Sequence, residues 1–175
     1  MPTPRVWFHC IVSTYGSWLP GDPRGFRTRH HREHVAGDYK SPPPVGAYEN
    51  FHAANQQALT QAVTTIPPPM RKIIGEALRD RLQKQGGEVL AIACGGQHAH
   101  VQVQLSDGDA RKPLGYAKQA ATSVTHQAGF VGKLWAVRGT LVRIRDRVHQ
   151  ERVYRYILEH ASEGAWVWSA LNQRE

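Results

Sequence analysis

Two histidines stand two positions apart, His98 and His100, in the segment QHAHVQVQL that spans Gln97 to Leu105. In an extended strand, side chains two residues apart leave the same face, about 7 Å from one another along the chain. Two imidazoles placed in this way can chelate one divalent metal ion, because imidazole is the commonest metal ligand at neutral pH. Two polar residues on a solvated strand face show the same spacing, so the pair by itself leaves both interpretations open.

A tyrosine and a third histidine stand four residues apart near the end of the chain, Tyr156 and His160, within RVYRYILEHASEG. Residues at i and i+4 share one face of a helix, so the phenol and the imidazole point the same way. If this helix packs against the strand of His98 and His100, it adds a third nitrogen ligand and a hydroxyl. Three histidine ligands leave coordination positions open for a phosphate oxygen. The four residues therefore predict a metal centre with a tyrosine beside it.

The elements that must position these residues follow from the patterning of the whole chain. Strands are predicted at Val6–Thr14, Glu88–Cys94, Gln97–Leu105 and Thr140–Arg145, and helices at Phe51–Val63, Met70–Gln85, Asp109–Gly129 and Asp146–Glu163. In the histidine strand the alternation is strict, with Ala99, Val101, Val103 and Leu105 on one face and His98, His100, Gln102 and Gln104 on the other. Glu88–Cys94 is almost wholly apolar, as a strand covered on both faces would be. The order of elements predicts an α+β fold with a mainly antiparallel sheet, ferredoxin-like or close to it.

The length of 175 residues suits a single domain over residues 1–175. This domain carries a basic insert rich in Pro and Gly at about residues 20–50, and the run from Gly21 to Asn50 is predicted to be a long loop. Cys10 and Cys94 both lie in apolar runs and are interpreted as buried small residues, neither a disulfide nor a metal site. No run of 18 apolar residues and no signal-peptide layout occurs, so we expect a soluble cytoplasmic protein with no membrane partner.

The charge of the chain is basic: 22 Lys and Arg stand against 14 Asp and Glu, giving +8. Such a balance favours a polyanionic partner through phosphate contacts and counterion release. The candidate DNA contacts are Arg24, Arg27, Arg29 and Arg32 in the insert, Lys118 on a helix, and Arg143 and Arg145 on the strand TLVRIR. For Arg143 and Arg145, which form a basic stripe near the tyrosine helix, a solvated charged face is the alternative. The histidines of the insert, His30, His31 and His34, are interpreted as part of a phosphate-contacting segment in preference to a metal site.

Four segments of the chain resemble segments of one protein family. QHAHV, followed about fifty residues later by RYILEHASEGAW, looks like the HUH motif and the tyrosine helix of single-tyrosine transposases. LWAVRGTLVRIRD is similar to the segment that precedes the tyrosine helix in REP-associated tyrosine transposases, and TYGSWLPGDPRGF resembles a stretch of transposase-like relatives. The resemblance touches most of the chain and is loose between Tyr39 and Gly87.

The resemblance implies roles for individual residues. His98 and His100 match the HUH histidines, Tyr156 matches the nucleophile, and His160 matches the polar third ligand, which is more often Asn or Gln. Ala99 is smaller than the apolar residue that is usual between the histidines, and the Asn-Pro that often follows the tyrosine is absent. The resemblance further implies the HUH palm fold and a divalent metal, Mg²⁺ or Mn²⁺ with other transition metals as alternatives. It also implies single-stranded or hairpin DNA as partner, a 5′-phosphotyrosine intermediate, a monomer or homodimer, and a nucleoid-associated location.

Two other functions fit the same residues. One is a non-catalytic single-stranded nucleic-acid-binding protein derived from a transposase, although no strand shows the aromatic pattern of RNA-recognition sheets. The other is a zinc hydrolase that activates water, for which Glu159 and Glu163 are the candidate general bases. Among other tyrosines, Tyr154 and Tyr15 are interpreted as structural, and Tyr116 is the alternative nucleophile.

Overall fold

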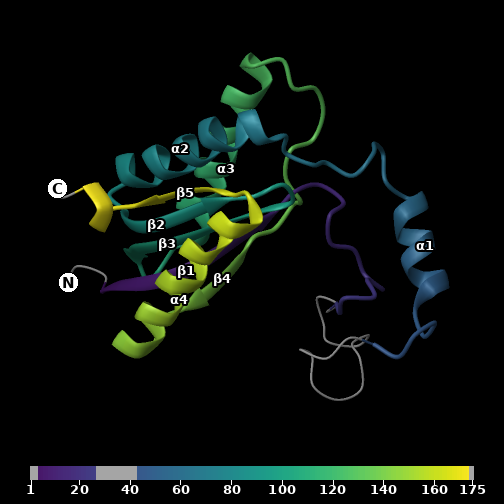
Figure 1. The fold of residues 1–175 in the computed structure, drawn as a ribbon, viewed down its shortest axis with the longest axis horizontal. Coiled ribbons are helices and arrows are strands. Elements are labelled where there is room, and N and C mark those ends of the chain that lie inside the picture. Colours follow the sequence, from purple (N-terminus) through teal and green to yellow (C-terminus); the bar gives the residue numbers. More distant parts are fainter. Residues whose placement is uncertain (1–3, 27–42, 174–175) are drawn as a thin grey trace.

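One antiparallel sheet organises the part of the chain that the computed structural model describes, residues 4–26 and 43–173. Its five strands lie in the order β4-β1-β3-β2-β5, and every neighbouring pair is antiparallel (Figure 1). The strands are β1 (Arg5–Ser13), β2 (Glu88–Cys94), β3 (His98–Ser106), β4 (Thr140–Arg143) and β5 (Trp166–Ser169). The prediction of an α+β fold with a mainly antiparallel sheet is confirmed.

The described residues also form four α-helices, three of which pack on the two faces of the sheet. They are α1 (Glu49–Gln57), α2 (Pro68–Lys84), α3 (Arg111–Gln127) and α4 (Arg147–Glu159), with short 3₁₀ turns at His160–Glu163 and Leu171–Gln173. α2 and α3 pack on one face, α4 crosses the other, and α1 lies apart from the sheet (Figure 1). None of the described helices is long and apolar enough to cross a membrane.

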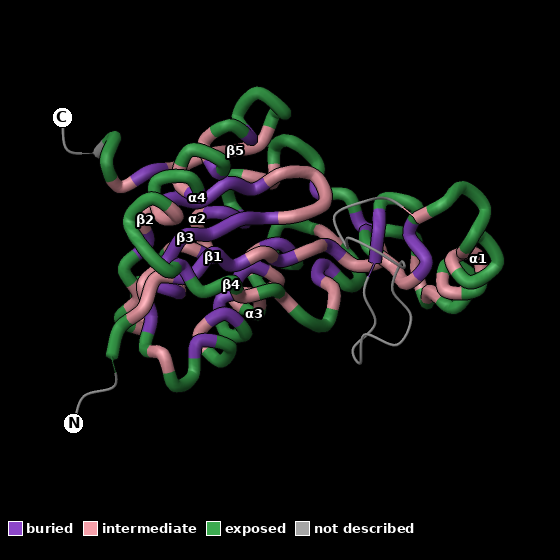
Figure 2. Tube along the Cα trace, turned by 90° about the horizontal axis from the view of Figure 1, so that it is seen from below, coloured by how far each residue is buried: buried purple, intermediate pink, exposed green. Residues whose placement is uncertain are grey.

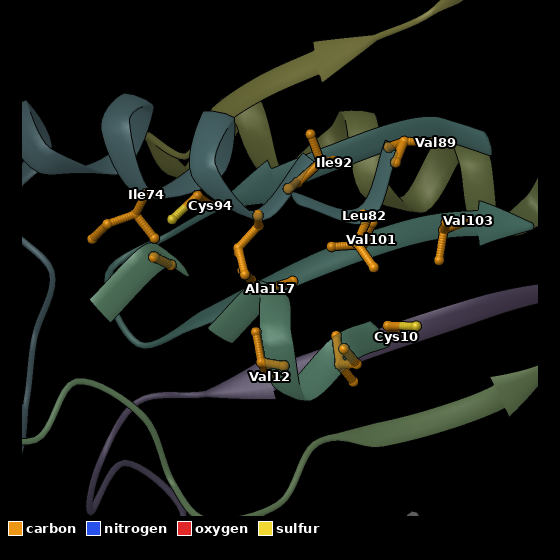
Figure 3. Packing of buried hydrophobic residues seen from close by; sticks show 14 of the residues in the cluster. Cys10, Val12, Ile74, Leu82, Val89, Ile92, Cys94, Val101, Val103 and Ala117 are labelled. Carbon is orange, nitrogen blue, oxygen red and sulfur yellow. The ribbon is translucent and has the colours of Figure 1, made fainter. Parts of the chain in front are cut away.

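β3 lies at the centre of the sheet, and its alternation divides the molecule. Its apolar residues are fully buried beneath α2 and α3, where they meet Cys10 and Val12 of β1 and Leu82 of α2 (Figure 3). Its polar residues, His98 to Gln104 in alternate positions, face α4 instead. The alternation predicted from the sequence is confirmed. The register of β3 is therefore strongly specified, because a shift by one residue would exchange its apolar and polar side chains between the two faces.

The predicted C-terminal ends of two helices differ from the observed ends by four residues or more. α1 was predicted to reach Val63, but it ends at Gln57 and has no buried residue (Figure 2). The chain leaves the helix because the following residues bond elsewhere: Thr64 N donates to Tyr15 O and Ile66 N donates to Gly96 O. The last helix was predicted to continue to Glu163; it ends at Glu159, and His160 begins a 3₁₀ turn.

β5 was not predicted, and it closes the edge of the sheet beside β2. Gly164 adopts a left-handed conformation with φ 78°, which ends the turn after α4 and reverses the chain. Trp166 then pairs with Cys94, and its ring packs over α2 at Gly75. A Cβ atom at position 75 would overlap that ring, so α2 needs a residue without a side chain there.

Candidate metal and tyrosine site

Three histidines from two distant segments meet on the α4 face of the sheet. His98 and His100 come from β3, and His160 comes from the 3₁₀ turn that follows α4. One nitrogen of each ring lies within 4.8 Å of the nitrogens of the other two. The rings of His100 and His160 stack with centroids 4.5 Å apart, and the centroids of His98 and His100 are 4.8 Å apart. The structure therefore brings these three side chains together, as the sequence predicted.

The hydrogen bonds of His160 fit this residue to a metal. Its Nδ1 lies 3.0 Å from Oε2 of Glu163, while its Nε2 is buried with no hydrogen-bond partner. A buried nitrogen without a partner costs free energy unless a ligand uses it. A carboxylate on the far nitrogen is the usual partner of a metal-binding imidazole. The donor set of three imidazole nitrogens suits a divalent transition metal.

A fourth histidine belongs to the same cluster, and the sequence interpretation missed it. His9 lies on β1, and its Nε2 is 2.9 Å from Nδ1 of His100. The alternation of VWFHCIVS carried the signal, since Trp7, His9 and Ile11 share the face opposite to Phe8 and Cys10. Only the strand order, which places β1 beside β3, brings His9 to the predicted histidines.

Burial keeps the imidazoles of His9, His98 and His100 neutral. It lowers the pKa of His100 to about 2 and that of His9 to about 4, with further lowering by neighbouring histidines. The pKa of His98 is also lowered, first by burial and then by His160. A metal binds the unprotonated imidazole, so these rings are available to it at neutral pH.

Tyr156 stands over this cluster from α4. Its ring lies edge-on to His100 and His160, with centroids 5.2 and 4.8 Å apart. The side chain is 43% exposed, so a large substrate can reach its hydroxyl. Burial of the remainder and the charge of Glu163 raise the pKa of this phenol, which is therefore protonated at neutral pH.

The other tyrosines lie in different surroundings. The Tyr154 hydroxyl is 2.7 Å from Ser169 Oγ, which ties α4 to β5, and the ring packs against the small apolar cluster under α4. Tyr116 lies on α3, on the opposite face of the sheet from the histidines, beneath Arg81. Tyr15 exchanges hydrogen bonds with Thr60. Among the described tyrosines, only Tyr156 has a ring that contacts the histidine cluster.

The predicted DNA-binding residues that the structure describes lie in different settings, and the charge of Arg24 contributes to the lowered pKa of His98. Arg24 forms an ion pair of 2.6 Å with Asp22 and also donates to Ser17 O, and Lys118 donates to the carbonyls of Ala136 and Val137. Arg143 is the register partner of Phe8, whose side chain lies on the α2–α3 face of the sheet, so Arg143 lies on that face as well. It forms an ion pair with Asp107. Arg145 is exposed in the link between β4 and α4. Residues Arg27, Arg29 and Arg32, with His30, His31 and His34, lie outside the described residues.

The structure is similar to that of a REP-associated tyrosine transposase bound to a REP hairpin, with a TM-score of 0.50 and 12% sequence identity. The match covers 94% of this chain and 72% of the other. The two proteins share a fold. No protein-family model and no curated protein matches the chain. At this identity the likeness concerns the fold, and what the site does must be argued from its own residues.

Proposed function

We propose that this protein is a metal-dependent endonuclease and strand transferase for single-stranded DNA, with Tyr156 as the nucleophile. The observation that carries the proposal is the convergence of Tyr156 with His98, His100 and His160 across almost sixty residues of sequence. The fold shared with a tyrosine transposase supports it, as does the net charge of +8. A REP hairpin is what that transposase binds, and we propose hairpin DNA for this chain as well.

The chain's residues divide the reaction between binding and attack. His98, His100 and His160 would hold a divalent ion, which when bound neutralises charge on a phosphate oxygen and makes the phosphorus more electrophilic. Tyr156 supplies the attacking oxygen: its Oη–P bond forms, the P–O3′ bond breaks, and the 3′ oxygen leaves as a hydroxyl after taking up a proton. The phenol must lose its proton in this step because its pKa is raised, and its half-exposed position lets water accept that proton.

The product is a 5′-phosphotyrosine link and a free 3′-hydroxyl. The link keeps the energy of the phosphodiester, so a 3′-hydroxyl from another strand can reverse the step and join two strands without ATP. A single-stranded substrate is proposed because the scissile phosphate must approach a cluster of buried rings beneath a helix.

Two hollows with cationic linings support a path for the strand. One, of about 570 Å³, is lined by Ser13, the register partner of His98, and by Trp18, Arg24 and Arg138. Trp18 is 50% exposed and offers a ring on which a base can stack, a contact worth about 1–3 kcal/mol. A second, of about 400 Å³, lies between β4 and the first turns of α4 and is lined by Arg145 and Arg152. Arginine side chains line both hollows, and the first includes Ser13, whose register partner is His98.

The insert before residue 43 is proposed to clamp a hairpin stem. Because Arg24 is engaged by Asp22, the test uses Arg27, Arg29 and Arg32 replaced together by alanine. Loss of up to three phosphate contacts should weaken hairpin binding and make the slope of log K against log salt shallower by about 2–3. Arg79→Ala is the comparison: Arg79 lies on α2 and pairs with Asp80, so its loss should leave that slope nearly unchanged. An unaltered slope in the triple variant would assign the insert another role.

The decisive experiment is incubation of the protein with single-stranded oligonucleotides and Mn²⁺ or Mg²⁺, followed by a denaturing gel. We expect a covalent protein–DNA adduct that EDTA prevents, and peptide mass spectrometry should place the DNA on Tyr156. An adduct on Tyr116 would move the nucleophile to α3.

The same experiment separates the three functions. Cleavage with no adduct would favour a zinc hydrolase that uses water. Of the two candidate general bases for that reaction, Glu163 bonds to His160 and Glu159 is exposed. Binding with neither cleavage nor adduct would favour the non-catalytic nucleic-acid-binding protein. Neither outcome is compatible with the strand transferase proposed above.

A further inference from the structure

A contact between two histidine rings adjoins the proposed metal centre. Nε2 of His9, on β1, lies 2.9 Å from Nδ1 of His100, and both residues are buried, with 8% and 4% of their surfaces exposed. The contact joins adjacent strands, since His9 is the register partner of Gln102, two positions beyond His100 on β3. No described residue bonds to Nε2 of His100, so that nitrogen remains available to a ligand.

The contact restricts the proton positions of both rings. A neutral imidazole carries one proton, on one of its two nitrogens, and the other nitrogen has the lone pair. If His100 gives a metal the lone pair of Nε2, its proton must be on Nδ1. Nδ1–H then donates to His9, and His9 must accept through a bare Nε2. The opposite arrangement, with His9 donating, puts the proton of His100 on Nε2 and prevents ligation through that atom.

We propose that His9 is a positioning residue: it accepts a hydrogen bond from Nδ1–H of His100 and thereby presents Nε2 of His100 to the metal. The inference rests on the metal centre of the proposed function, and it does not depend on Tyr156 or on DNA cleavage. His9 itself does not touch the metal, because its Nε2 is occupied by His100.

The other end of the cluster has a matching arrangement. Glu163 engages Nδ1 of His160 at 3.0 Å, which leaves the buried Nε2 of His160 without a partner. Both ligands are thus held through Nδ1 and offer Nε2, and their rings lie nearly parallel, 13° apart. The two partners differ in setting: the side chain of Glu163 is 68% exposed, whereas His9 is enclosed by the sheet and α4. An exposed hydrogen bond can be replaced by water, so His9 should matter more to the site than Glu163.

The first test needs no substitution and no metal. Nitrogen-15 correlation spectra of the metal-free protein distinguish the two neutral forms of each histidine, because protonated and bare ring nitrogens resonate far apart. We expect His100 to carry its proton on Nδ1 and His9 to be bare at Nε2. A spectrum in which His100 is protonated on Nε2 would overturn the proposal.

The second test measures binding of Co²⁺ alone, by its visible absorption, in variants of position 9. His9→Met fills the volume but accepts no strong hydrogen bond, and it should weaken Co²⁺ binding by about 10–100-fold. His9→Gln can place an amide oxygen near the position of Nε2, and it should restore most of the affinity. His126→Gln is the matched control: His126 lies on α3 and bonds to the carbonyl of Gly132, so the variant should bind Co²⁺ as the wild type does.

The two proposals can fail separately. Wild-type Co²⁺ affinity in His9→Met would overturn the role of His9 even if DNA is joined normally. If Met and Gln lower the affinity equally, the hydrogen bond is not what position 9 supplies, and the inference fails as well. Absence of a DNA adduct, with the spectra and affinities as expected, would instead remove the strand transferase and leave the positioning role in place. Should His9→Met fail to fold, the wild-type spectrum still decides.

Discussion

The two faces of the sheet are built from the same strands and have opposite contents. Under α2 and α3 the buried side chains are apolar, and Ile74, Leu78 and Leu82 have no exposed surface. Under α4 the buried side chains include His9, His100, Gln102 and His160. Only five buried residues, from β2, α4 and the chain after β4, form an apolar cluster on that side among the described residues. One face therefore supplies most of the hydrophobic stabilisation, while the other retains buried polar groups that cost free energy.

Small residues allow α4 to lie close to a polar surface. Ala91 and Ala93 of β2 pair with Gln102 and His100, and they leave room for Ile157 of α4 to pack against the sheet. Gln102 donates to Gln150 O on α4, but its Oε1 is buried with no partner. The α4 face is therefore stabilised less well than the core face, and substitutions on the two faces should separate activity from stability.

The sharpest separation is expected from Tyr156→Phe. This substitution removes the attacking oxygen, so adduct formation should fall below detection on a denaturing gel. The ring is half-exposed and no described residue bonds to its hydroxyl, so the free energy of unfolding should change by less than about 0.5 kcal/mol. Tyr154→Phe is the matched control: it should lose about 0.5–1.5 kcal/mol with the Ser169 hydrogen bond and keep adduct formation.

The reverse outcome is expected from Leu78→Ala on the core face. Leu78 is fully buried in the large apolar cluster, so a cavity should form and the free energy of unfolding should fall by about 2–5 kcal/mol. Urea denaturation measures the loss. Adduct formation per folded molecule should stay within about twofold of wild type. A specific loss of activity at temperatures where the variant is folded would show that the faces are not independent.

His160→Gln should have a smaller effect, which depends on the metal. An amide oxygen replaces an imidazole nitrogen, so binding of Co²⁺ or Zn²⁺ should weaken by about 10–100-fold, whereas Mg²⁺ prefers oxygen ligands. Calorimetry with each ion and adduct assays in Mg²⁺ test the difference. Equal losses with all three ions would contradict the idea that His160 tunes the choice of metal.

The last effect expected is a pH dependence of stability in the metal-free protein. In the unfolded chain His9 and His100 take up protons below about pH 6.5. In the folded protein they stay neutral until about pH 4 and about pH 2. The unfolded state thus binds more protons between these values, and the free energy of unfolding should fall as pH drops from about 6.5 towards 4. Denaturation midpoints at several pH values measure this fall. His9→Gln should make it shallower, and an identical pH profile in that variant would contradict the neutral state of His9.

The local parts of the site followed from periodicity. His98 and His100 share a strand face, and Tyr156 and His160 share a helix face, so each pair was predictable within its own element. The buried, unpaired state of both cysteines also followed, from the apolar runs around them. His9 did not follow, because a single histidine in a run of β-branched and aromatic residues looks like any core residue. Its place depends on which strand pairs with β3, and that is a non-local contact.

The elements that were missed or misplaced share a short length or a long-range cause. β5 has four residues, and two of them are tryptophans whose partners lie on β2 and α2, so no periodicity could show it. α1 stops at Gln57 because later residues bond to the chain after β1, far away in sequence. The insert of arginines and histidines lies largely outside the described residues, and its role stays a prediction.

Gly75 connects the face that stabilises to the face that reacts, although it carries no side chain. Its bare backbone receives the ring of Trp166, and Trp166 follows the turn of His160 by only six residues. A methyl group at position 75 must push this ring, and with it the start of β5, outward from the sheet edge. Because Trp166 is only six residues from His160, this displacement would also shift His160, a proposed metal ligand. In a library of random substitutions, position 75 should therefore behave like an active-site position, intolerant even of alanine, while it lies on the opposite side of the sheet from every reacting atom.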